Sequence, residues 1–187
     1  MHISTYEIKD IRLTENRDMM HKLVMTMFDK DRSTENVLFM IHEEKITVRS
    51  DKKPKSPPEP LILLNMYDVS SMLSRFLPGS VLTIYGMFEP TICQNGRKNL
   101  IRDKVDRIKW VQRKFSNAGC LLSINEVSQD NIRIMKNSGD KRRSSFFGYI
   151  IEIQILDSEK FKELFRHGIG RSKAYGAGMS VVLNDRN

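Results

Sequence analysis

The stretch Gly168-Ile169-Gly170-Arg171-Ser172-Lys173-Ala174-Tyr175-Gly176-Ala177-Gly178 is the most informative part of this chain. It holds four of the ten glycines. Glycine lets backbone approach a ligand closely, and Arg171, Lys173 and Tyr175 suit a phosphate with a base beside it. We interpret the stretch as a nucleic-acid-binding loop that precedes a last strand. For Tyr175 the alternative is a ring packed under that strand.

The segments before this loop alternate between strands and helices. Residues 159–166 have the pattern of a helix that Asp157 or Ser158 caps, and Gly168 fits the position just after its end. Residues 104–117 form a second predicted helix, with apolar residues at helical spacing. The remaining pattern predicts a polar loop over 137–143 and strands over 121–127, 132–135, 147–156 and 179–183.

The first half of the chain has a comparable order. Residues 17–28 predict a helix with Met20, Leu23, Val24 and Met27 on one side. The other predictions are strands over 3–13, 37–41, 46–50 and 81–88, a polar turn over 29–36, a proline-containing loop over 51–60 and a short helix over 66–76. Strand-helix-strand-strand-helix-strand is the order of a ferredoxin-like unit.

Both halves therefore predict an α+β fold made of tandem ferredoxin-like (RRM-like) domains. We place the boundary near the turn at Cys93-Gln94-Asn95-Gly96, with one domain over 1–92 and the other over 93–187. No internal sequence repeat is evident, so the duplication is inferred from the pattern of elements alone.

The positive charge is concentrated in the second domain. Residues 94–187 hold 19 Lys and Arg against 10 Asp and Glu, whereas residues 1–93 hold 12 against 13. This asymmetry favours a polyanion held by one domain or in a basic groove between the two. An ordinary basic surface is the alternative.

Other sequence features argue against several classes of protein. Cys93 and Cys120 form neither a zinc pattern nor a disulfide framework, so we expect two thiols in a reducing compartment. Residues 1–13 mix charges with single apolar residues, and no apolar run is long enough to cross a membrane. We expect a soluble cytoplasmic protein without a membrane partner.

Three stretches carry a family resemblance. They are the helix and glycine loop over 157–182, the hairpin over 35–50, and a central segment whose motifs are Glu89-Pro90-Thr91, Asn95-Gly96-Arg97-Lys98 and Trp110-Val111-Gln112-Arg113-Lys114. With them the chain resembles the CRISPR-associated repeat-processing endoribonucleases, most closely the CasE subfamily of type I-E systems. The family has two tandem ferredoxin-like domains.

The resemblance implies an endoribonuclease that binds the hairpin of a CRISPR repeat. It is expected to cleave precursor CRISPR RNA at the stem base, to give mature guide RNA. The ribose 2′-hydroxyl attacks the adjacent phosphate, without a metal or another cofactor. The implied partners are the repeat hairpin and other subunits of a type I-E interference complex.

His21 is the catalytic residue that the resemblance implies, because the family has a Tyr-x-x-His motif in this helix. Helical spacing places His21 at the rim of the apolar stripe. The alternative to a catalytic role is an ordinary solvated histidine on the helix surface. Asp18 stands where the family has tyrosine, and we interpret it as a helix cap. The role of the family tyrosine then falls to a tyrosine of another segment, or His21 acts without one. His167, next to the glycine loop, is a competing catalytic candidate.

The predicted RNA contacts come from three basic segments, and no metal ligands are expected. The candidate residues are Arg97, Lys98, Arg102, Lys141, Arg142, Arg143, Gly168, Gly170, Arg171, Lys173 and Tyr175. The alternatives are a catalytically weak or inactive RNA-binding subunit with the same fold, a structural subunit of a CRISPR complex, and an unrelated RNA-recognition module. For the last of these, the sequence has no clear RNP motif.

Overall fold

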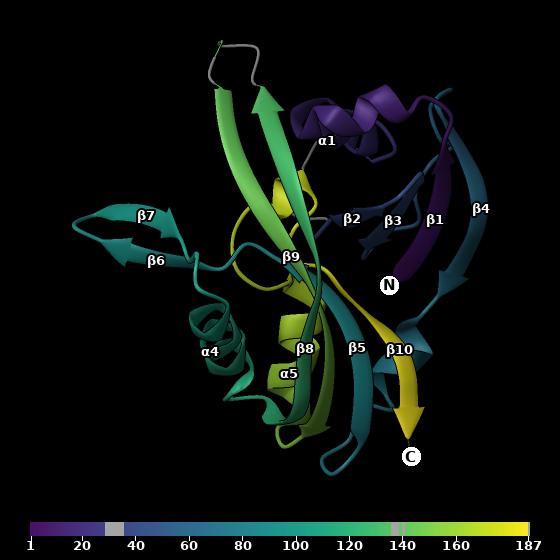
Figure 1. The fold of residues 1–187 in the computed structure, drawn as a ribbon. Coiled ribbons are helices and arrows are strands. Elements are labelled where there is room, and N and C mark those ends of the chain that lie inside the picture. The colour runs from purple at the N-terminus through teal and green to yellow at the C-terminus, as the bar shows by residue number, and fades with distance from the viewer. Residues whose placement is uncertain (29–35, 136–138, 140, 187) are drawn as a thin grey trace.

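The computed structural model describes residues 1–28, 36–135, 139 and 141–186. It contains two four-stranded antiparallel sheets, each with helices on one face (Figure 1). Residues 29–35 of the expected polar turn and part of the loop expected over 137–143 lie outside the described residues. Where the chain is described, it has no helix of the length and apolarity needed for a transmembrane segment.

The first sheet has the strand order β2-β3-β1-β4. Helix α1 (Arg17–Met25) covers it and buries Met20 and Val24 against the strands. A short 3-10 helix, η1 (Ile11–Glu15), leads into α1. The hairpin expected over 37–50 is confirmed. The strands are β1 (His2–Ile8), β2 (Leu38–His42), β3 (Lys45–Ser50) and β4 (Leu61–Asp68).

Strand β4 corrects the helix predicted over 66–76. Residues up to Asp68 are extended, and only α3 (Ser70–Leu73) is helical. The backbone of β4 pairs with β1 from Leu61↔Ile8 to Asp68↔His2. This long-range pairing outweighs the local helical spacing, because strand formation depends on a partner strand.

The second sheet has the order β10-β5-β9-β8. Helices α4 (Lys104–Phe115) and α5 (Ser158–His167), both expected from the sequence, bury Phe115 and Phe161 against it. The strands are β5 (Val81–Phe88), β8 (Gly119–Met135), β9 (Lys141–Ile155) and β10 (Ser180–Arg186). A separate hairpin projects from this unit and consists of β6 (Thr91–Gln94) and β7 (Arg97–Leu100) (Figure 1).

Strand β5 lies in a different sheet from the one we predicted. We expected residues 81–88 to complete the first sheet, but β5 pairs with β9 and β10 in the second. Counted along the chain within each sheet, both sheets then have the order 4-1-3-2 of a ferredoxin-like fold. We therefore propose that the two units meet between 68 and 81, rather than at residue 92.

The ribbon of β8 and β9 is longer than predicted. One strand, β8, replaces the two expected over 121–127 and 132–135, and residues 141–143 belong to β9 rather than to a loop. The two strands stay paired from Gly119↔Ile155 to Met135↔Lys141, with register shifts that absorb the irregular pattern. The ribbon extends beside α1 of the first unit (Figure 1).

Arg49 links the two units. Its side chain is buried, its Nη1 donates to the Ser180 carbonyl at 2.6 Å, and its Nη2 donates to the Phe165 carbonyl. The guanidinium also lies 3.9 Å from the centroid of the Phe165 ring. Burial lowers the pKa of Arg49 to about 9. A residue of β3 thus binds the end of α5 and the start of β10, which fixes the glycine loop between them.

Candidate functional site

The glycine-rich loop closes on itself between α5 and β10. The Ile169 N–H donates to the Gly178 carbonyl at 2.8 Å, and the Gly178 N–H donates to the Met87 carbonyl at 2.6 Å. Gly168 has φ +72° after α5, which confirms the predicted helix end. These backbone bonds hold both ends of the loop against β5, so the residues between them protrude from a fixed base.

Gly168 and Gly170 are needed because the backbone packs closely. A methyl group on Gly168 would lie 2.7 Å from the Gly178 carbonyl oxygen, and one on Gly170 would lie 2.9 Å from Cη2 of Trp110. Both residues also have positive φ. Gly168 is buried, so it has a structural role, and the RNA contacts expected at both glycines stay predictions.

Glu89 anchors the loop from the end of β5. It is 1% exposed, and its carboxylate accepts hydrogen bonds from Ser172 of the loop and from Ser144 of β9. Arg142 forms an ion pair with the same carboxylate. Glu89 belongs to the motif Glu89-Pro90-Thr91, but its sequence position does not reveal this role, because its three partners are distant in sequence.

His21 faces the glycine loop from the first unit. Its helix begins after Asn16, whose side chain accepts a hydrogen bond from the Asp18 N–H and so caps the helix. The imidazole is half-buried, and its ring centroid lies 6.4 Å from that of Tyr175, at an interplanar angle of 75°. A histidine of the first unit thus contacts an aromatic residue of the second.

Tyr175 packs against apolar residues, but not under the last strand as the alternative had it, and its contact with RNA stays a prediction. Its ring is half-buried and packs against the apolar cluster that includes Ile132, Phe146 and Ala177. The same ring also contacts His21. The packing therefore fixes an aromatic ring beside the candidate catalytic group.

Asp18 is not the helix cap that we expected. It lies in the first turn of α1 and pairs with Lys22, one turn later, at 2.6 Å. An acid in a first turn stabilises the helix through the macrodipole. Asn16 provides the cap instead, because it precedes the first helical residue.

Lys173 and Arg171 lie half-buried in the same loop. The pKa of Lys173 is lowered, mainly by burial and then by the positive charge of Lys114. Both effects disfavour the charged form of Lys173, and an anion bound beside it would stabilise that form. Lys114, at the end of α4, belonged to a basic run in the sequence, but helical spacing alone did not distinguish it from a solvated cation.

The remaining predicted contacts spread over the hairpin and the ribbon. Arg97 and Lys98 are exposed on β7, and Arg102 is exposed just before α4. Lys141 and Arg143 are exposed on β9, whereas Arg142 is held by Glu89. The structure adds Arg133 of β8, which is exposed and paired with Arg143 in the sheet register. Strand alternation over 132–135 is the signal that identifies Arg133.

A groove separates α1 from the ribbon. It has a volume of about 500 Å³, and its lining includes Arg17 and Arg133 together with Glu15 and Asp130. The lining of this groove is thus mixed in charge, with two arginines beside two carboxylates. Arg17 is buried, so its pKa is lowered, and within the described residues its Nε and Nη1 have no hydrogen-bond partner. Arg17 was not among the predicted site residues, although it lies one turn before His21.

The competing histidine has a partner of its own. His167 is exposed, and its Nδ1 lies 3.0 Å from the amide oxygen of Asn36. His42 is at the end of β2, with its ring 6.4 Å from that of Tyr85. In the part of the chain that the structure describes, no three His, Cys, Asp or Glu side chains are grouped closely enough to hold a metal ion.

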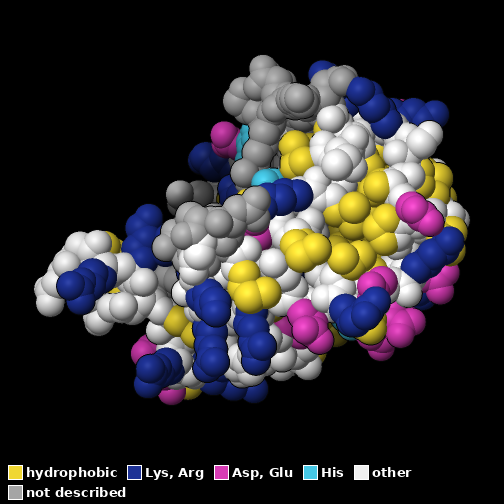
Figure 2. All heavy atoms as spheres, turned by 90° about the horizontal axis from the view of Figure 1, so that it is seen from above, with side chains coloured by type: hydrophobic (Ala, Val, Ile, Leu, Met, Phe, Trp, Pro, Cys, Tyr) yellow, Lys and Arg dark blue, Asp and Glu magenta, His cyan; other side chains and the backbone are white. Residues whose placement is uncertain are grey.

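Apolar side chains gather on one half of the face seen in Figure 2, with charged side chains of both signs around them. Groups of Lys and Arg also lie on the other half, as far as the projecting hairpin.

Known structures share this architecture. The structure of a CRISPR endoribonuclease, Cse3, bound to 19 nt RNA matches with a TM-score of 0.87 and 14% identity, over 98% of this chain and 100% of that one. Cas6e from Escherichia coli str. K-12 matches with a TM-score of 0.78 and 19% identity, over 97% and 98%. A chain of a CRISPR RNA-guided surveillance complex matches with a TM-score of 0.75 and 17% identity, over 97% and 99%.

At the sequence level, a comparison with curated proteins gave no significant match. A family model described as CRISPR associated protein matches residues 1–182. The match covers the first sheet, the helix with His21, the whole glycine loop and the second sheet as far as the start of β10. The two-domain fold expected from the sequence is that of the Cse3 and Cas6e structures, and the chain belongs to the CRISPR-associated protein family.

Proposed function

We propose that this protein is an endoribonuclease that binds the hairpin of a CRISPR repeat and cleaves precursor CRISPR RNA at the stem base. One observation carries the proposal: His21 of the first unit lies against Tyr175 in the glycine loop of the second. Arg171 and Lys173 belong to the same loop, whose 3-10 helix Lys173–Tyr175 lies against α1. A histidine of the first unit thus faces a loop of the second unit that carries two cations. The likeness to Cse3 bound to RNA supports the same reading.

The reaction we propose is an internal transfer at one phosphate. The 2′-oxygen bonds to phosphorus as the bond to the 5′-oxygen of the next nucleotide breaks. The 2′-hydroxyl loses a proton to a base, and the leaving oxygen gains one from an acid. The products are a 2′,3′-cyclic phosphate and a 5′-hydroxyl. No metal is needed in this scheme.

His21 has the chemistry for one of the two proton transfers. An imidazole can accept a proton as a base or donate one as an acid. Lys173 is suited to the charge that develops on the phosphate, because its half-buried ammonium gains from a neighbouring anion. Tyr175 restricts the position of the imidazole through its ring.

The RNA itself would lie on the basic side of the second unit. The exposed cations Arg97, Lys98, Arg102, Lys141 and Arg143 are spaced along the hairpin and the ribbon. Duplex RNA is recognised mainly through its shape and phosphates. Binding should weaken steeply with salt, with a log–log slope of roughly −3 or steeper if several phosphates are neutralised. A flat dependence between low and moderate salt would contradict this.

A second candidate function rests on Asp18. Its carboxylate is close to His21 along the helix and pairs with Lys22, and a negative charge near a scissile phosphate slows attack. The protein would then be a weak or inactive RNA-binding subunit of a CRISPR interference complex. The likeness to a chain of a surveillance complex fits both candidates, since either would hold RNA among other subunits in the cytoplasm.

A cleavage assay separates the two candidates. A cognate repeat RNA is incubated with the protein in EDTA, beside a copy with a single 2′-deoxy nucleotide at the cut site. Specific cutting in EDTA that disappears with the deoxy RNA and with His21→Ala supports the enzyme. His167→Ala is the matched control and should cut normally. Tight binding with no cutting favours the inactive subunit, and equal cutting by His21→Ala would remove His21 from its role.

A further inference from the structure

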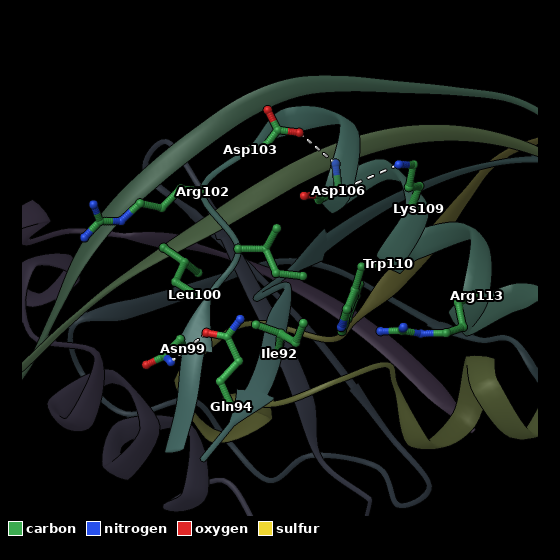
Figure 3. A pocket seen from close by; sticks show the side chains of 11 residues that line it. Ile92, Gln94, Asn99, Leu100, Arg102, Asp103, Asp106, Lys109, Trp110 and Arg113 are labelled. Atoms are coloured by element: carbon green, nitrogen blue, oxygen red, sulfur yellow. Dashed lines mark hydrogen bonds and ion pairs between the residues drawn. The ribbon is translucent and has the colours of Figure 1, made fainter. Parts of the chain in front are cut away.

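A pocket lies between the projecting hairpin and α4, apart from His21 (Figure 3). Its volume is about 420 Å³, which is in the range of small-molecule sites. The hairpin contributes Ile92, Gln94 and Asn99, and the helix contributes Trp110 and Arg113 from the opposite side (Figure 3). We call this the hairpin pocket.

The strand pairing gives the hairpin a defined pocket face. Ile92 pairs with Asn99, and Gln94 pairs with Arg97, so these four side chains share one face of the two-stranded sheet. Ile92 is 42% exposed there, although it is apolar. The two amides, 3.5 Å apart between Asn99 Nδ2 and Gln94 Oε1, can both donate and accept hydrogen bonds. This face of the hairpin thus combines an apolar surface with two amides that can form hydrogen bonds to the polar edge of a ligand.

The helix side offers unused donors. Trp110 is buried except for an edge, and no described residue accepts a hydrogen bond from its indole N–H. Arg102 and Arg113 line the pocket, and neither guanidinium has an acidic partner among the described residues. The acids are already engaged: Asp103 caps α4 by accepting from the Asp106 N–H at 3.0 Å, and Asp106 pairs with Lys109 at 3.6 Å.

The pocket is connected to the candidate active site through the glycine loop. Gly170 of the loop packs on Trp110, and Tyr175 of the same loop contacts His21. An RNA strand that follows the loop from His21 therefore reaches the side of α4. A duplex is too wide for a pocket of this size, whereas a single extruded or unpaired nucleotide fits its chemistry.

We propose that the hairpin pocket binds one unpaired ribonucleotide next to the RNA stem. The base lies on Ile92 and the edge of Trp110, with its polar edge on Gln94 and Asn99, and the phosphate contacts Arg102 or Arg113. Unpaired bases are the usual targets of sequence-specific RNA recognition, through such amides and guanidinium groups. This inference rests on the proposed function and extends it from the stem to a flanking nucleotide.

The test uses the full chain with His21→Ala, so that RNA stays intact. Two hairpins are compared, one blunt and one with unpaired nucleotides on each side that carry 2-aminopurine in turn. Trp110 is the single tryptophan of the chain, so its fluorescence reports on this pocket. We expect the flanked hairpin to bind at least tenfold more tightly, with 2-aminopurine quenched at one position and Trp110 emission changed.

The Gln94→Ala/Asn99→Ala double variant changes only exposed hairpin side chains and should abolish this preference. Cys93→Ala is its matched control, because Cys93 is exposed on the other face of the hairpin. Equal affinity for both hairpins, or a preference that survives in the double variant, would overturn the proposal. A wild-type protein that prefers the flanked hairpin but cuts no repeat would refute the proposed reaction and leave the pocket standing.

Discussion

Replacing Glu89 tests whether the glycine loop depends on one buried carboxylate. Glu89→Ala removes the acceptor for Ser144, Ser172 and Arg142 together. A hydrogen bond to a charged group contributes about 1.5 kcal/mol or more, so the two serines account for about 3 kcal/mol. Arg142 is 42% exposed, and its solvent-screened ion pair adds only about 0.5–1 kcal/mol. The expected loss of unfolding free energy is therefore about 3.5–4 kcal/mol.

Glu89→Gln separates charge from geometry. A glutamine oxygen can still accept from Ser144 and Arg142, and its amide can donate to the Ser172 hydroxyl, which also accepts. We expect this variant to lose about half as much stability as Glu89→Ala. If the alanine variant fails to fold, the glutamine variant keeps the reasoning testable.

Urea unfolding followed by Trp110 fluorescence and by circular dichroism measures both losses. Trp110 packs against Gly170, so its emission also reports on the loop. Glu163→Ala is the control, because Glu163 is exposed on α5, and its cost should stay within about 0.5 kcal/mol. A loss below about 1 kcal/mol for Glu89→Ala would refute the assigned anchoring role.

Three further changes have defined outcomes. Arg49→Met leaves two carbonyls of the second unit unpaired, so urea unfolding should show a loss of about 2–4 kcal/mol; an unchanged midpoint would contradict the link between units. The hydrogen-bonded Arg107 holds the pKa of Glu126 below its usual range. Glu126 thus stabilises the fold above about pH 4.3, and this stability is lost as the pH falls through the lowered pKa. The melting temperature of Glu126→Gln should therefore depend less on pH in that window than that of the wild type. Melting temperatures that fall equally with pH in both proteins would contradict the Arg107–Glu126 pair. Tyr175→Ala should lower single-turnover cleavage at least tenfold and Tyr175→Phe much less, because the ring restrains His21; equal losses would assign the effect to the hydroxyl.

Local patterns were sufficient for much of the fold. The capped helix from Ser158 to Gly168 and the hairpin of β2 and β3 follow from residues adjacent in sequence, through capping, turn residues and alternation. The asymmetric charge also indicated the half of the chain that carries the larger share of the cations. These features depend on short-range spacing, which the sequence contains.

Pairing between distant segments was not readable in the same way. Strand β5 has an apolar pattern that fits either sheet, and only its registers with β9 and β10 assign it to the second. Similarly, residues 61–68 form a strand because β1 offers an edge. A period of two specifies a strand but not its neighbour.

The candidate site divides along the same line. The sequence alone determined the residue types, namely a histidine in the first helix, a glycine loop near the end and cations in the second half. Only the tertiary structure brought Tyr175 to His21, tied the loop to Glu89 and formed the hairpin pocket. The physical reason is that each of these contacts joins segments far apart in the chain. The packing of the two sheets brings these segments together, and the spacing of residues along the chain does not encode that packing.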